Sequence, residues 1–471
     1  MKTLRAYSLD ALRGYAILTM VLSGQIASGV LPACMYHAQV GPRSGGAFDP
    51  SFVGITWVDL VFPFFLFAMG AAFPFSLGSK LERGVNKLKL AGQSFLRYLR
   101  LAFFAIFIQH AYPHSLSQPQ DVRSWCLALV AFALLLPMFM RIKAEWPRWV
   151  KAAIELGGYA AGVTFLLTVD YAGDRTFSLG YSNIIILVLA NMAFFGSVIY
   201  ILTWRNARAR WTLLPFVMAI LLGCSTEGSW QAWLMNATPA PWLYRFLFLK
   251  YLFIVLPGTL AGEWLRGWLQ RRATQPSPAT ASSPIHDYCA ALLGLAVIVC
   301  NLYGLYTRQL VANLVATAVL LVALWAVVRK VEGDDGEYWR KLLAAGAYLL
   351  MLGLFFEAFE GGIRKDSSTF SYYFVTSGLA FIALITLSVV CDLHRAGGWT
   401  RILELPGQNP MVAYVAPQLF VLPIIKLVGL GDWLNSLSST PFEGLMRGVI
   451  VTALAMAVAS FFSLRRWYWR T

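Results

Sequence analysis

The strongest constraint on this chain is a succession of apolar stretches, each close to the length that crosses a bilayer, about 17 to 25 residues. Fourteen such stretches lie near residues 14–32, 54–77, 101–113, 124–140, 152–169, 184–203, 212–225, 243–262, 289–306, 309–328, 342–356, 371–391, 406–428 and 445–464. Those at 212–225 and 342–356 also suit re-entrant or tilted segments. The predicted fold is therefore an all-α polytopic membrane protein with 12–14 transmembrane helices, each satisfying its own backbone groups.

Composition agrees with a membrane protein, because only 13% of the residues are charged, whereas soluble proteins have about 25%. The net charge of +15 would suit a nucleic-acid binder if it were spread over a soluble surface. With a cytoplasmic N-terminus, however, 28 of the 38 Lys and Arg residues fall in segments on the cytoplasmic side and 6 in the opposite loops. The positive-inside rule therefore places both termini in the cytoplasm, and no nucleic-acid partner is expected.

The chain is expected to form one integral membrane domain in two parts. Residues 1–270 and 288–471 hold the spans, and the Pro-, Ser- and Thr-rich segment 271–287 is predicted to be a flexible cytoplasmic linker. Asp10 is unusual in the n-region of a secretory signal, so the first span is expected to stay in the protein. The cysteines lack metal-ligand spacing, and no metal site is predicted.

Three histidines are predicted on the outer side. His37 lies in the loop between the first two spans, and His110 and His114 lie in QHAYPH. Each suits a hydrogen-bonded structural histidine. Each also suits a general base or acyl-accepting nucleophile, because imidazole titrates near neutral pH.

Asp59 is an acidic residue inside an apolar stretch, ITWVDLVFPFF. A carboxylate in a span is costly and usually faces a cavity or a partner. One interpretation is a structural pairing between helices. The other is that Asp59 orients His37 and stabilises its charged form.

A basic segment follows the second span and includes Arg83, Lys87 and Arg97. Topology and anionic lipid headgroups account for most of these charges. Arginine also binds phosphate well, so some of them suit a phosphorylated donor, with Arg13 the best-placed single candidate. The chain has no P-loop or GxGxxG motif, which argues against ATP use or dinucleotide redox chemistry.

Two further groups of polar residues are candidates. Gln408 and Asn409 lie in LPGQNPMVAYV, where Pro and Gly break an apolar pattern; this segment suits a helix cap or the wall of a donor tunnel. Outer-side acids such as Glu227, with nearby tryptophans, suit sugar binding, although interfacial aromatic belts explain the tryptophans equally well.

Together, SLDALRG, the histidine-bearing loop, ITWVDLVFPFFLFAMG and PGQNPMVAYV resemble the heparan-alpha-glucosaminide N-acetyltransferase family of transmembrane acyltransferases. The resemblance is strong over residues 1–100, fair from about 340 onwards and weak between. That family moves an acetyl group from cytosolic acetyl-CoA to the amine of a terminal glucosamine across the membrane. The loop after His37 carries an insertion, residues 41–52, relative to the family.

The resemblance implies roles for individual residues. His37 would be the base or transient acyl carrier and Asp59 its partner, with Gln25 or Ser23 replacing an asparagine of the family. The predicted acetyl-CoA site comprises Asp10, Arg13, Arg83, Lys87, Arg97, Gln408 and Asn409, and the predicted acceptor site comprises His110, His114 and Glu227.

The predicted function is transfer of acetyl from acetyl-CoA to an amino sugar or related glycan, in a bacterial cytoplasmic membrane. Two alternatives stay open: a non-catalytic transporter or flippase for a sugar or lipid-linked glycan, and an O-acetyltransferase of a cell-envelope polysaccharide. Membrane lipids and the glycan are the expected partners, and a homodimer is an open alternative. Transfer through a covalent acetyl-histidine and direct transfer in a ternary complex are both compatible with the sequence.

Overall fold

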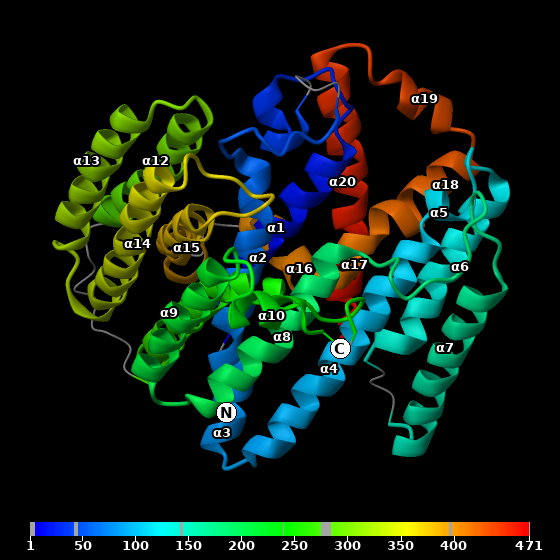
Figure 1. Ribbon diagram of the computed structural model, residues 1–471, viewed down its shortest axis with the longest axis horizontal. Coiled ribbons are helices and arrows are strands. Elements are labelled where there is room, and N and C mark those ends of the chain that lie inside the picture. Colours follow the sequence, from blue (N-terminus) through cyan, green and yellow to red (C-terminus); the bar gives the residue numbers. More distant parts are fainter. Residues whose placement is uncertain are drawn as a thin grey trace.

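The computed structural model describes residues 5–41, 46–141, 145–238, 240–274, 284–394 and 398–470. Its long helices are α1 (Tyr7–Gln25), α2 (Trp57–Phe73), α4 (Lys87–Ala111), α6 (Val122–Phe139), α7 (Arg148–Thr168), α8 (Ile184–Leu202), α9 (Ala207–Gly223), α11 (Leu252–Thr274), α12 (Pro284–Tyr306), α13 (Leu310–Val328), α14 (Gly333–Phe359), α15 (Phe370–Leu387) and α20 (Pro441–Leu464). In Figure 1, α12–α15 form a group at the left and α5–α7 a group at the right, with α1, α2 and α20 between them.

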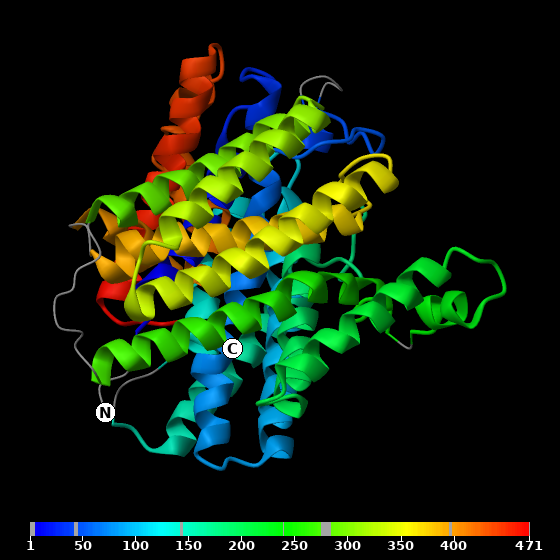
Figure 2. The same ribbon diagram turned by 90° about the vertical axis from the view of Figure 1, so that its left-hand side faces the viewer.

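Short helices connect and extend the long ones. They are α3 (Ser79–Glu82), α5 (Pro113–Leu116), α10 (Trp230–Asn236), α16 (Arg401–Gly407), α17 (Pro410–Ala416), α18 (Leu422–Leu427) and α19 (Gly431–Ser436), with 3₁₀ segments η1 (Ala33–Met35), η2 (Ala38–Val40), η5 (Phe246–Tyr251) and η7 (Gly398–Thr400) and π segments η4 (Pro74–Gly78), η6 (Ser388–Leu393) and η8 (Pro417–Val421). Two of the three π segments begin at a proline, which cannot donate to the helical hydrogen-bond ladder. Figure 2 shows α10 and its loops extending to one side of the helical body.

Twelve helices among the described residues are long and apolar enough to cross a membrane. This confirms the predicted all-α polytopic membrane protein. The other two predicted stretches, near 14–32 and 212–225, overlap α1 and the 17-residue α9. The stretch 342–356, for which a re-entrant segment was an alternative, lies within the continuous 27-residue α14.

The two parts of the chain are packed together. The rings of Phe67 on α2 and Phe381 on α15 lie 4.9 Å apart between centroids. Helices α2 and α11 approach so closely that a β-carbon on Gly258 would stand 2.3 Å from the Phe67 carbonyl oxygen. Small residues allow such close helix approach in membrane proteins. The core therefore runs through both parts as one body.

The predicted linker is shorter than expected from the sequence. α11 continues to Thr274 and α12 begins at Pro284, so both ends of segment 271–287 are helical, and residues 275–283 lie outside the described residues. Arg271 and Arg272 at the end of α11 form ion pairs with Asp334 and Asp335, which begin α14. These ion pairs, at 2.7 and 2.8 Å, join the last turn of α11 to the first turn of α14.

Candidate functional site

The loop that carries His37 is fixed on both sides of the histidine. The hydroxyl of Tyr36 donates to the carbonyl of Ala27 at 2.6 Å and accepts from the amide of Leu31 at 2.9 Å. The hydroxyl of Thr56, just before α2, donates to the carbonyl of Tyr36 at 2.7 Å. These bonds hold the residue before His37 against the start of α2.

Asp59 lies in the first turn of α2 and is fully buried. Its Oδ2 accepts from the backbone amides of Thr56 at 2.9 Å and Ala38 at 3.2 Å, the first of which belongs to a capping box. The same carboxylate therefore caps α2 and ties down the residue after His37. The sequence placed Asp59 inside the predicted span 54–77, and the structure places it in the first turn of the corresponding helix.

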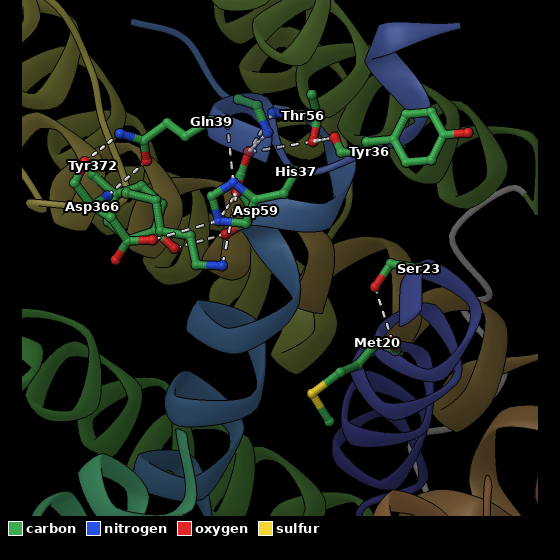
Figure 3. Close-up of polar contacts among 11 residues, drawn as sticks. Met20, Ser23, Tyr36, His37, Gln39, Thr56, Asp59, Asp366 and Tyr372 are labelled. Carbon is green, nitrogen blue, oxygen red and sulfur yellow. Dashed lines mark hydrogen bonds and ion pairs between the residues drawn. The ribbon is translucent and has the colours of Figure 1, made fainter. Parts of the chain in front are cut away.

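The imidazole of His37 lies between two carboxylates. Nε2 is 3.2 Å from Oδ1 of Asp59 and 3.6 Å from Oδ2 of Asp366, while Nδ1 accepts from the backbone amide of Gln39 at 3.2 Å (Figure 3). This arrangement suits the tautomer protonated at Nε2. The ring is mostly buried, with 18% of the side chain exposed.

Burial is the main influence on His37 and lowers its pKa below 6.5. The carboxylates of Asp59 and Asp366 act in the opposite direction, and the ammonium of Lys365 adds to the lowering. The imidazole is therefore neutral at pH 7, which is the form that takes up a proton.

Lys365 and Asp366 come from the loop between α14 and α15, more than 300 residues away in the sequence. The side-chain amide of Gln39 binds the backbone of Asp366 in both directions, accepting from its amide at 2.9 Å and donating to its carbonyl. Nζ of Lys365 lies 3.9 Å from Oδ1 of Asp59. Glu360 fixes the other end of this loop by accepting from the amides of Phe370 and Ser371, both at 2.8 Å. Sequence reasoning assigned no role to Gln39, Lys365 or Asp366.

A large basic cavity lies further along α2. Its volume is about 860 Å³, and its lining includes Arg5, Asp10, Arg13, Phe65, Met69, Lys80, Arg97, Arg100, Gln408, Tyr468 and Arg470. We call it the donor cavity, because its lining includes several residues of the donor site predicted from the sequence. Three segments predicted on the cytoplasmic side, 1–13, 78–100 and 465–471, thus meet at one cavity, with six cationic side chains and one carboxylate in its lining.

Asp10 organises part of this lining. Its Oδ2 is 3.1 Å from Nε of Arg5 and its Oδ1 is 3.6 Å from Nη1 of Arg13. The carboxylate of Asp10 thus pairs with two arginines of the cavity lining.

Other predicted donor-site residues lie elsewhere. Arg83 and Lys87 are exposed and outside the cavity lining. Asn409 is buried and binds the C-terminal segment, with Nδ2 donating to the carbonyl of Trp467 at 2.9 Å and Oδ1 accepting from the amide of Trp469 at 3.1 Å. Of the seven predicted residues, Asp10, Arg13, Arg97 and Gln408 line the donor cavity.

The remaining candidates are not joined to His37 by any contact among the described residues. Gln25 ends α1, and Ser23 donates back to the carbonyl of Met20 at 2.9 Å, away from the histidine in Figure 3. His110 is buried, with Nδ1 2.9 Å from the carbonyl of its own helix at Ile106.

The two other predicted acceptor residues lie near the surface. The ring of His114 stacks on Tyr112 with centroids 5.6 Å apart. Glu227 is exposed in the loop between α9 and α10. The predicted catalytic and acceptor roles of Gln25, His110, His114 and Glu227 stay predictions.

Fold and site define a multi-pass integral membrane protein with a basic cavity at one end of a buried helix and a histidine between carboxylates at the other. Residues 5–265 match the family described as a domain of unknown function, DUF5009. Because the match covers more than half of the chain, the protein belongs to that family.

The chain is also similar to heparan-alpha-glucosaminide N-acetyltransferase of Homo sapiens. The two are 28% identical over 189 residues, which cover 35% of this chain and 26% of the human protein. The chain thus matches about a quarter of the length of this curated relative, and the similarity indicates a distant relationship.

Proposed function

We propose that the protein is a transmembrane acyltransferase that takes an acetyl group from acetyl-CoA in the donor cavity and transfers it to an amine at His37. The acceptor would be an amino sugar or related glycan. One observation carries the proposal: the donor cavity and the His37–Asp59 pair lie along the same helix. Phe65 of α2 lines the cavity, six residues after Asp59, which corresponds to about 9 Å along a helix axis.

The donor cavity suits coenzyme A in charge and size. Its cationic side chains, mainly arginines, match the phosphates at one end of the donor. Its apolar wall, formed by Phe65 and Met69 of α2, suits the less polar arm that ends in the thioester. A volume of about 860 Å³ lies in the usual range for small-molecule sites.

His37 would act as the general base. The acceptor amine would displace the Gln39 amide from Nδ1 and give its proton to that atom, while Asp59 and Asp366 at Nε2 stabilise the imidazolium that forms. The amine nitrogen bonds to the acetyl carbon, the carbon–sulfur bond breaks, and coenzyme A leaves with the electron pair as its thiolate. Transfer through an acetyl-histidine stays an alternative.

The experiment uses the full chain in liposomes with labelled acetyl-CoA and glucosamine. Acetylated glucosamine and free coenzyme A are expected, and His37→Ala is expected to lower turnover by at least about 100-fold, the lower range for a general base. His286→Ala, at the start of α12, is the control and should leave turnover unchanged. Wild-type turnover in His37→Ala would overturn the assignment, and glucosamine flux without any need for acetyl-CoA would favour a transporter.

A further inference from the structure

A second cavity, of about 360 Å³, lies between the beginning of α7 and the end of α6. Its lining consists of Arg100, residues 137–141, Lys151, Glu155 and Arg470. We call it the α6–α7 cavity. It holds four cationic side chains and one carboxylate, and the proposed acyl transfer uses none of α6 or α7.

Among the described residues, three of the four cationic side chains in this cavity form no ion pair. Glu155 pairs with Arg100. Within the described ranges, Arg141 and Lys151 form no ion pair. By contrast, Arg271 and Arg272 at the end of α11 each pair with an aspartate. Basic side chains gathered in a cavity without acidic partners favour an anion from outside the chain.

Backbone bonds hold the basic groups in place. The amide of Arg470 donates to the carbonyl of Phe139 at 2.8 Å, and the amide of Arg141 donates to the carbonyl of Tyr468 at 3.0 Å. The C-terminal segment is thereby fixed against the end of α6. Arg141 and Arg470 thus enter the cavity from a paired backbone rather than from free loops.

An exposed apolar face runs along α7, the helix that contributes Lys151 and Glu155 to the cavity. This face consists of four exposed residues at helical spacing, Trp149, Leu156, Val163 and Leu167. Because a helix turns about 100° per residue, Leu156 lies about 100° around the helix axis from Glu155. Only 22% of the α7 span is buried inside the protein, the lowest share among the twelve spans. Trp149, 73% exposed, marks the polar end of this surface, where tryptophans anchor at membrane interfaces.

We propose that the α6–α7 cavity binds the phosphate headgroup of an anionic phospholipid, with the acyl chains lying along the exposed face of α7. A free phosphate would satisfy the charges but would make no use of the exposed apolar face of the same helix. Arg100 and Arg470 line both this cavity and the donor cavity. A bound headgroup would therefore hold the shared wall between the two cavities.

The test measures lipid retained by the full-length protein, by native mass spectrometry, after extraction from vesicles of equal parts phosphatidylcholine and phosphatidylglycerol. We expect wild type to retain phosphatidylglycerol. Arg141→Gln with Lys151→Gln should lower its affinity roughly 30-fold, from about fivefold for each charge near a lipid surface. Arg208→Gln with Lys330→Gln is the matched control, because both residues are exposed and outside both cavities.

Thermal unfolding in pure phosphatidylcholine vesicles shows whether the variants fold, and Arg141→Lys with Lys151→Arg, which keeps both charges, should retain the lipid. If Arg141→Gln with Lys151→Gln retained as much phosphatidylglycerol as wild type, that result would overturn the proposal. So would displacement of the lipid by millimolar inorganic phosphate, which would indicate a free-anion site, or by coenzyme A, which would assign the cavity to the donor. None of these measurements needs acyl transfer, so the result is independent of the proposed function.

Discussion

Gly407 of α16 touches the backbone of α1 at Asp10: a β-carbon at position 407 would stand 2.0 Å from the carbonyl oxygen of Asp10. One turn further along α1, the glycine is on the other helix: a β-carbon on Gly14 would stand 1.7 Å from the carbonyl oxygen of Leu403 on α16. The SLDALRG and PGQNP segments, about 400 residues apart, therefore meet through their glycines. This crossing brings Asp10, Arg13 and Gln408 to the same cavity.

Gly407→Ala is expected to destabilise the protein, because the added methyl group has only backbone to displace. Overpacking of this kind costs about 1–3 kcal/mol, and backbone contact favours the upper end. Thermal unfolding in detergent measures the loss. Gly24→Ala, on α1 with nothing within 4 Å of the added β-carbon, should be neutral or stabilising, and equal losses in the two variants would contradict the crossing.

The pH profile of kcat/KM should respond in opposite directions to two substitutions near His37. Burial lowers the pKa of His37, so the acid limb of the wild-type profile should lie below the pH at which a free histidine titrates. Asp59→Asn removes a charge that favours the imidazolium, so the pKa should drop further and the acid limb should move to lower pH. Lys365→Gln removes a charge that opposes the imidazolium, so the pKa should rise and the limb should move to higher pH.

The two shifts are expected to be opposite in sign, because the charges of Asp59 and Lys365 act in opposite directions on the pKa of His37. Asp59→Asn should also lower kcat, because the imidazolium loses its buried partner. Shifts of the same sign in both variants would show that His37 does not control the profile.

Arg97 and Arg83 form a matched pair for testing the donor cavity. Arg97 lines the cavity and Arg83 is exposed outside it. Loss of a hydrogen bond to a charged phosphate costs about 1.5–3 kcal/mol, so Arg97→Ala should raise the KM for acetyl-CoA roughly 10- to 100-fold. Arg83→Ala should leave it within about twofold. Steady-state kinetics with varied acetyl-CoA measures both, and a larger effect at Arg83 would place the donor elsewhere.

The sequence predicted the helices well because span length and hydropathy are local properties. It also placed His37 and Asp59 together, because both lie in or beside the loop that joins α1 to α2. It could not predict that Lys365 and Asp366 reach His37, because that contact depends on Gln39 binding a distant loop. Likewise, Arg83 and Arg97 belong to the same basic segment of the sequence. Only the packing of α4 against α8 shows that Arg97 lines a cavity while Arg83, before α4, is exposed.

Asn409 gives a test that separates a structural role from direct donor binding. Its amide joins α17 to the C-terminal segment, which contributes Tyr468, Trp469 and Arg470 to the donor cavity. Asn409→Ala leaves the part-buried carbonyl of Trp467 and the buried amide of Trp469 without their partner. An unsatisfied buried group costs about 1–3 kcal/mol. We therefore expect faster hydrogen exchange over residues 465–470 together with a raised KM for acetyl-CoA.

The control is Asn435→Ala, an exposed asparagine on α19, which should change neither quantity. If Asn409 instead contacted the donor directly, as its place in the PGQNP segment first suggests, KM would rise while exchange over 465–470 stayed at the wild-type rate. The two measurements in one variant thus decide between the roles. The geometry favours the structural one, because both polar atoms of the side chain are already bonded to the C-terminal backbone.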